Sequence, residues 1–236
     1  MTVKKSGKIK IQQAGKAAPI MKEKTGIVFS IAQDNPPVTG CTVSREVTDN
    51  TQLITYYSLA SGTDISAELY PYHKLLLLAD GSAQVYGTVN ALLARPGDGI
   101  LTPVNVPVGI QTRAGAIYTE ILIRSTDHMN QAIKAGEVFQ LADLVPYGDG
   151  KIVNMDVVHN DKMKFVLMAF DAGTGLSEHA APGEALIFAL DGEGIIGYEG
   201  KEHHIRAGEN FHFAKGGKHF VKANGRFKMA LLLTLE

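Results

Sequence analysis

The side chains best suited to chemistry in this sequence are histidines, and six of the eight lie after residue 150. Imidazole titrates near neutral pH, so a histidine can act as an acid, a base or a metal ligand. His179 follows a Gly-Thr-Gly turn, and His219 follows a Gly-Gly pair after the strand-like segment that contains His212. This distribution directs the search for a functional site to the second half of the chain.

Other catalytic patterns are missing from the sequence. It contains neither a GxxxxGK[ST] phosphate loop nor a GxSxG motif, and the turn at residues 192–194 lacks the following helix that a dinucleotide site requires. Ser177 and His179 are near neighbours on one predicted strand, so with Glu178 they do not form a catalytic triad. Cys41 is the single cysteine, which excludes an intrachain disulfide.

Charge and hydropathy patterning exclude two classes of partner. The 23 basic and 24 acidic residues give a formal net charge of -1, so we expect neither nucleic acid nor an anionic membrane as a partner. The longest apolar runs, at residues 75–79 and 230–233, are far shorter than the roughly 18 residues of a membrane span. The basic segment 1–10 lacks the apolar run of a secretory signal, so a cytoplasmic protein is expected.

The chain contains an internal repeat with a shift of 111 residues. The repeated positions are mostly glycines at turns, which mark backbone requirements rather than surface preferences. The matching pairs are Gly62 with Gly173, Gly81 with Gly192, Arg95 with Arg206, and Gly97 with Gly208. The two halves are therefore interpreted as duplicated domains.

Each half has the pattern of a β-protein. Short apolar or alternating runs, such as residues 164–170 and 185–190, are separated by glycine-containing turns at a spacing typical of sandwiches and barrels. The expected helical pieces are confined to the connector, at residues 126–135 and as a turn at 139–144.

The second half of the sequence resembles the cupin superfamily. The first cupin motif corresponds to Gly173-TGLSE-His179-Ala180-Ala181-Pro182-Gly183-Glu184-ALIFALD-Gly192, and the second to Gly208-ENFHF-Ala214-Lys215-Gly216-Gly217-Lys218-His219. The resemblance implies an all-β fold of two tandem cupin barrels, each a double-stranded β-helix or jelly roll. We expect an N-terminal arm at residues 1–24, a degenerate barrel at 25–126, and a barrel with the candidate site at 127–236.

The resemblance also implies a metal site that is incomplete here. In metal-bearing cupins two histidines, a glutamate and a last histidine bind one divalent ion; His179 and His219 match, whereas Ala181 replaces the second histidine. Glu184 lies one residue before the expected glutamate, so strand alternation turns it away unless the preceding turn at 182–183 restores its direction. The reduced set of His179, His219 and Glu184 suits Fe, Mn, Ni or Zn, with His212 as a substitute ligand.

A second interpretation needs no metal. His179 and His219 would then bind a small organic ligand by hydrogen bonding or exchange protons with it, beside aromatic walls such as Phe188. In the first half Glu68 and Val108 replace the matching histidines, so a cupin-type metal is not expected there. Glu68 and His73 could form an acid–base couple, but the favoured interpretation of this half is a structural barrel that packs against its twin.

The expected function is therefore that of a cupin acting on a small polar metabolite, with an enzyme and a non-catalytic binding, sensor or assembly protein as open alternatives. The superfamily implies a homodimer.

Overall fold

The computed structural model describes residues 21–48, 53–87 and 90–235, so most of the expected N-terminal arm lies outside the described residues. The strands before residue 124 are β1 (Val28–Phe29), β2 (Thr42–Glu46), β3 (Ile54–Leu59), β4 (Asp64–Glu68), β5 (His73–Gly81), β6 (Ala83–Tyr86), β7 (Leu92–Ala94), β8 (Asp98–Leu101), β9 (Val108–Gln111) and β10 (Ala116–Ile123). Those after it are β11 (His128–Met129), β12 (Val138–Gln140), β13 (Ile152–His159), β14 (Met163–Phe170), β15 (Gly175–Ala180), β16 (Glu184–Tyr198), β17 (Lys201–Arg206), β18 (Asn210–Phe213) and β19 (Lys218–Thr234).

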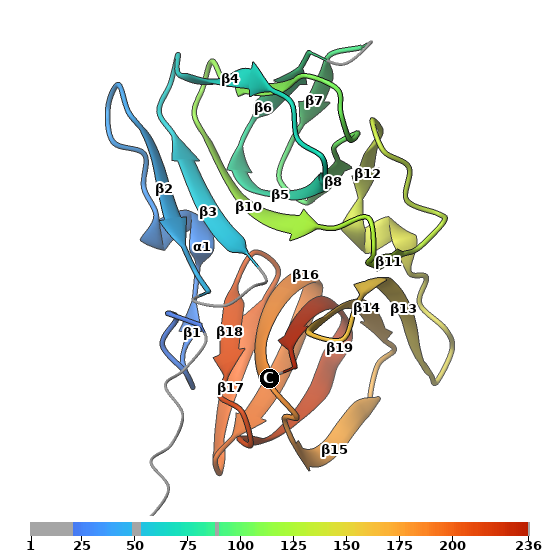
Figure 1. The fold of residues 1–236 in the computed structure, drawn as a ribbon. Helices are drawn as coiled ribbons and strands as arrows, with labels where there is room; N and C mark the ends of the chain where they lie inside the picture. The colour runs from blue at the N-terminus through green and yellow to red at the C-terminus, as the bar shows by residue number, and fades with distance from the viewer. Residues whose placement is uncertain (1–20, 49–52, 88–89, 236) are drawn as a thin grey trace, which may run out of the picture.

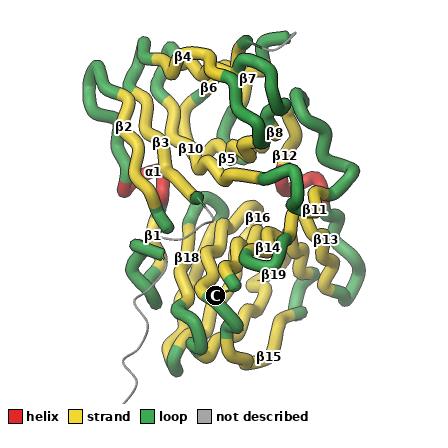
Figure 2. Tube along the Cα trace, in the orientation of Figure 1, coloured by secondary structure: helices red, strands yellow, loops and turns green. Residues whose placement is uncertain are grey.

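The regular secondary structure of the described chain is almost entirely β-strand, as predicted (Figure 2). Its helical segments are single turns, α1 (Ile31–Asp34) and the 3-10 turn η1 (Leu141–Leu144). The expected turn at 139–144 is therefore confirmed, whereas the helix expected at 126–135 is wrong, because β11 occupies that segment and pairs with β13. Among the described residues, no helix has the length and apolar character needed to cross a bilayer.

Two halves, β2–β10 and β13–β19, lie one above the other (Figure 1). Within the described residues the N-terminal half has a sheet of order β12-β8-β5-β10-β3-β2 and a second of order β4-β9-β6-β7. The C-terminal half has one continuous sheet, because the long strands β16 and β19 run where the N-terminal half has β5 with β6 and β9 with β10.

The predicted repeat is present in the strand pairing. Glu68 lies opposite Val108 and His179 opposite His219, after an irregularity at the same point of each ladder. The register shift between β5 and β10 likewise recurs between β16 and β19 at positions 111 residues later. The duplication seen in the sequence thus extends to the register of individual residues.

Each half receives a strand from outside it. β1 precedes the N-terminal half but pairs with β18 of the C-terminal half, and β12 precedes the C-terminal half but pairs with β8. The partners are equivalent, because Val28 lies opposite Phe211 and Val138 opposite Ile100. A single helical turn follows each exchanged strand, so α1 and η1 occupy matching places.

The core follows the alternation of the strands. On β5, Leu76 and Leu78 face the interior of the N-terminal half, whereas Leu75 and Leu77 face the other half. On β16, Ile187 faces the interior of the C-terminal half and Leu186 joins the shared core between the halves. Two internal cores and one shared core therefore hold the molecule together.

Candidate functional site

His179 and His219 lie opposite each other on β15 and β19. Their ring centroids are 4.2 Å apart, and the rings are tilted by 54°. His219 is buried at 7% exposure, whereas His179 is exposed. The pair therefore extends from the interior of the C-terminal half to its surface. The strand pairing thus brings together the two histidines that the sequence singled out.

Hydrogen bonds to the backbone set the tautomer of both rings. Nδ1 of His179 lies 2.8 Å from the carbonyl oxygen of Ser177, and Nδ1 of His219 lies 3.0 Å from that of Gly217. Because a carbonyl oxygen only accepts, each Nδ1 carries a proton, and in the neutral ring Nε2 then presents a lone pair. Burial lowers the pKa of His219, and the neighbouring His179 lowers it further, so the His219 ring is neutral at pH 7.

Aromatic side chains form the inner wall of this pair. Phe213 stacks on His219 with ring centroids 4.1 Å apart, and Tyr198 contacts Phe213 at 5.5 Å. Phe211 and Phe213 face the core of the C-terminal half because they alternate with His212 along β18. The expected aromatic surroundings of His219 are present, although Phe188 does not belong to them.

Glu184 and His212 form a separate pair on the opposite face of the sheet. Leu186 and His212 are cross-strand neighbours, and Leu186 belongs to the shared core, so side chains of this face point away from His219. His212 Nε2 lies 3.4 Å from Glu184 Oε2. The expected ligand set is thereby corrected: the turn at 182–183 does not bring Glu184 to the histidine pair, and His212 does not replace it.

The Glu184–His212 pair holds the N-terminal segment instead. Glu184 Oε2 accepts a 2.6 Å hydrogen bond from the backbone amide of Met21, and His212 Nδ1 lies 2.9 Å from the carbonyl oxygen of Glu23. Burial lowers the pKa of His212 despite its acidic neighbours. These two side chains therefore attach the start of the described chain to the C-terminal half.

The residues present do not fit a resident metal. Catalytic zinc sites use three protein ligands, and among the described residues no group of three or more histidine, cysteine or acidic side chains is arranged to hold an ion. Of the expected set, the rings of His179 and His219 face each other, whereas Glu184 and His212 pair with each other elsewhere. A tightly bound metal would need donors that this site lacks.

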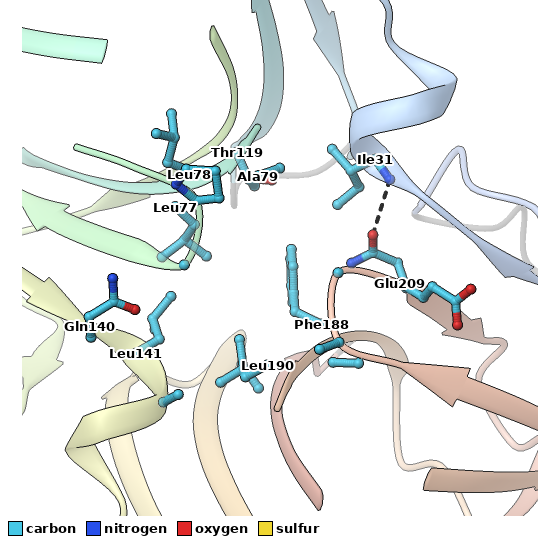
Figure 3. A pocket seen from close by; sticks show the side chains of 18 residues that line it. Ile31, Leu77, Leu78, Ala79, Thr119, Gln140, Leu141, Phe188, Leu190 and Glu209 are labelled. Atoms are coloured by element: carbon cyan, nitrogen blue, oxygen red, sulfur yellow. Dashed lines mark hydrogen bonds between the residues drawn. The ribbon is translucent and has the colours of Figure 1, made fainter. Parts of the chain in front are cut away.

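Phe188 lies in a cavity between the two halves that the sequence analysis missed. The cavity has a volume of about 360 Å³, and Leu77 faces Phe188 and Leu190 across it (Figure 3). Phe188 points there because it shares the outward face of β16 with Leu186. The signal in the sequence was the repeat itself, since residues 77–79 and 188–190 are equivalent positions 111 apart.

The N-terminal half has different chemistry at the equivalent place. The Tyr70 hydroxyl donates to Glu68, whereas His73 Nδ1 contacts the carbonyl oxygen of Thr102. The expected Glu68–His73 couple is therefore wrong. Instead, Lys74 forms a 3.3 Å ion pair with Glu120 inside this half, and the Lys74 ammonium lies 3.8 Å from the centre of the Tyr70 ring.

The comparisons with known proteins agree with this fold. Residues 166–235 match the family described as Cupin domain. No curated protein matches the chain. A Cupin 2 conserved barrel domain protein from Leptotrichia buccalis superposes with a TM-score of 0.80 at 25% identity, over 91% of this chain and 99% of that one.

More distant structures share the fold alone. A variant of salicylate 1,2-dioxygenase from Pseudoaminobacter salicylatoxidans has a TM-score of 0.61 at 12% identity, over 94% of this chain and 88% of its own. A variant of oxalate decarboxylase from Bacillus subtilis has a TM-score of 0.50 at 14% identity, over 89% and 77%. The activities in these names are those of the neighbours.

Proposed function

Because the chain belongs to the cupin superfamily, we propose that it is a bicupin that binds a small polar metabolite at His179 and His219. One observation carries the proposal: two facing imidazoles, each fixed by a backbone carbonyl at Nδ1, present their Nε2 atoms from adjacent strands. Such fixed acceptors recognise ligand groups that donate hydrogen bonds, such as the hydroxyls of a sugar or a hydroxy acid.

The two rings offer different chemistry to such a ligand. His219 is held neutral by its burial, so its Nε2 accepts a proton or a hydrogen bond at pH 7. His179 is exposed, so its ring can meet a ligand that arrives from solvent. If the site is catalytic, His219 is the general base, and a substrate hydroxyl or C–H group placed at its Nε2 is the proton donor.

The proposal involves no resident metal. The donor set lacks a third protein ligand, since Ala181 stands where a histidine would be needed and Glu184 faces Met21. A divalent ion could occupy the two imidazoles only as an exchangeable species whose other ligands come from water or the metabolite. This second candidate rests on the facing rings of His179 and His219.

A thermal-shift screen with sugars and hydroxy acids tests the proposal, with and without a chelator. A ligand present at 100 times its dissociation constant stabilises the fold by about 2.7 kcal/mol. For a chain of this length that raises the Tm by several degrees. The rise should persist with chelator present and disappear in His179→Gln and in His219→Gln.

His128→Gln is the matched control. His128 and His159 also face each other across adjacent strands, with ring centroids 5.0 Å apart, so they reproduce the paired imidazoles elsewhere on the molecule. The control should keep the full ligand response. A response that needs added Ni²⁺ or Zn²⁺ and vanishes with chelator would replace this proposal by the metal candidate, and a response unchanged in both site variants would refute both.

Two further expectations stay predictions. The homodimer is checked by light scattering of the full chain, and a single-chain mass would contradict it. The cytoplasmic location is checked by fractionating the cells that produce the protein.

A further inference from the structure

The cavity between the halves lies where equivalent segments of the repeat meet. Its wall contains residues from both halves that are related by the shift of 111, and it is completed by residues of α1 and η1. The equivalent pairs are Leu77 with Phe188, Leu78 with Ala189, Ala79 with Leu190, Pro96 with Ala207, Gly97 with Gly208, and Thr119 with Ala230. The cavity thus belongs to the pairing of the halves and is separate from the histidine pair.

The size and lining of the cavity suit a small organic molecule. Its volume of about 360 Å³ falls within the range of known ligand pockets, which are mostly apolar with a few fixed polar groups. Leu77, Phe188, Leu190 and Leu141 line the cavity with apolar side chains, as Figure 3 shows. Apolar cavities of smaller volume are known to take up uncharged aromatic molecules.

Thr119 is one of the polar residues that line this cavity, together with Gln140, Glu209 and Asn210. It is only 1% exposed, and its side chain lies on the face of β10 that is turned toward the other half, because Tyr118 faces the interior of its own half. The Thr119 hydroxyl can both donate and accept a hydrogen bond. A ligand group that donates or accepts a hydrogen bond at this position would pair with it.

The charged residues that line the cavity determine which ligand charge it favours. Among the described residues that line the cavity, Glu209 is the only charged one, and it is half-buried. No lysine, arginine or histidine of the described chain lines it, so an anionic ligand would meet a carboxylate without a compensating cation. The lining therefore favours an uncharged or cationic ligand.

We propose that this cavity is a second ligand site, which takes a small molecule with an apolar body and one hydroxyl or amino group. The apolar body packs between Leu77 and Phe188, and its polar group bonds to the Thr119 hydroxyl. Because the wall comes from both halves, the ligand stabilises their association. This site is independent of the proposed function, since the histidine pair lies on the opposite face of β16.

Three probes of one skeleton test the site in the full chain: benzyl alcohol, benzylamine and benzoate. Binding is measured by methyl NMR titration, with leucine and alanine methyl groups assigned. The alcohol and the amine should shift the Leu77 and Leu190 methyl resonances, and benzoate should bind at least about fivefold more weakly. Thr119→Val keeps the shape of the side chain and should weaken the alcohol by roughly three- to tenfold, the usual effect of one hydrogen bond.

Ala79→Leu should abolish binding, because the larger side chain fills the cavity. Leucine is also the residue at the equivalent position of the other half, Leu190. Ala67→Leu, at an exposed position of β4, is the matched control and should leave all three affinities unchanged. His179→Gln should also leave them unchanged, which separates this site from the proposed metabolite site. Equal binding of benzoate, no effect of Thr119→Val, or shifts confined to residues around His219 would each overturn the proposal.

Discussion

The two halves share their strand register but not their chemistry. The positions occupied by His179 and His219 in one half hold Glu68 and Val108 in the other, across equivalent strands. Conversely, the Lys74–Glu120 ion pair of the N-terminal half has Ala185 and Leu231 at the equivalent positions. Backbone contacts therefore fix where strands lie, whereas the side chains that face inward are free to differ so long as they fill the core.

The corner glycines show where the halves cannot differ. Gly81 and Gly192 both have positive φ, and a Cβ at either would lie about 2 Å from a backbone oxygen, at 2.1 Å in the first and 1.9 Å in the second. We expect Gly81→Ala and Gly192→Ala each to lower the free energy of unfolding by about 4 kcal/mol or more, since backbone must move in both. Urea unfolding measures this effect, the largest expected here.

Gly62→Ala and Gly173→Ala are the controls for that experiment. Both glycines have similar positive φ, but no atom lies within 4 Å of an added Cβ. Each should therefore cost only the strain of the left-handed conformation, about 1–2 kcal/mol. If the corner variants cost no more than these, close backbone approach is not what the repeated corners require.

The features that could be predicted from the sequence are those with local causes. Turn glycines and strand alternation indicated the all-β fold and the repeat, and the resemblance to cupins assigned His179 and His219 to one site. The direction of Glu184 could not be derived, because the Pro182–Gly183 turn interrupts the alternation that would settle it. The exchanged strands β1 and β12 and the cavity at Phe188 arise from contacts between distant segments, which a local pattern does not contain.

The buried ion pair of the N-terminal half gives the next largest effect. Lys74 and Glu120 are 13% and 10% exposed in their side chains, so removing one partner leaves a buried charge. We expect Lys74→Met to lower the free energy of unfolding by about 3 kcal/mol. Burial already raises the pKa of Glu120, so the loss should be smaller at pH 5, where the carboxyl can bind a proton, than at pH 8.

Adding Glu120→Leu should recover most of that loss, because leucine is the residue at the equivalent position 231 and leaves no charge to bury. Lys164→Met, which breaks the exposed ion pair with Asp156, should change stability by less than about 1 kcal/mol. Urea unfolding at the two pH values measures all four proteins. A double variant as unstable as Lys74→Met would show that the ion pair does more than fill the interior of this half.

The smallest expected effect is the decrease in the free energy of unfolding at acidic pH, and it should arise from the C-terminal half. His212 is buried there with a lowered pKa, whereas the equivalent residue of the N-terminal half is Leu101. Because the folded state resists protonation of His212, the unfolded state binds more protons below the ordinary histidine pKa of about 6.5. The free energy of unfolding should therefore be level above that pH and fall below it, by at most about 1.4 kcal/mol per pH unit for one such group.

His212→Leu removes that difference in proton binding, so the free energy of unfolding should decline less steeply between pH 6.5 and 5.5. Part of the decline should remain, because the pKa of His219 is also lowered. The variant loses the contact with Glu23, so its stability at pH 8 should be lower than that of the natural sequence while its slope is shallower. His128→Gln, at an exposed position, should change neither. Urea unfolding from pH 5.5 to pH 8 measures both the stability at pH 8 and its change with pH, so the two effects can be told apart. A His212→Leu profile parallel to that of the natural sequence would place the acid sensitivity elsewhere, and the asymmetry between the halves would then not extend to their response to pH.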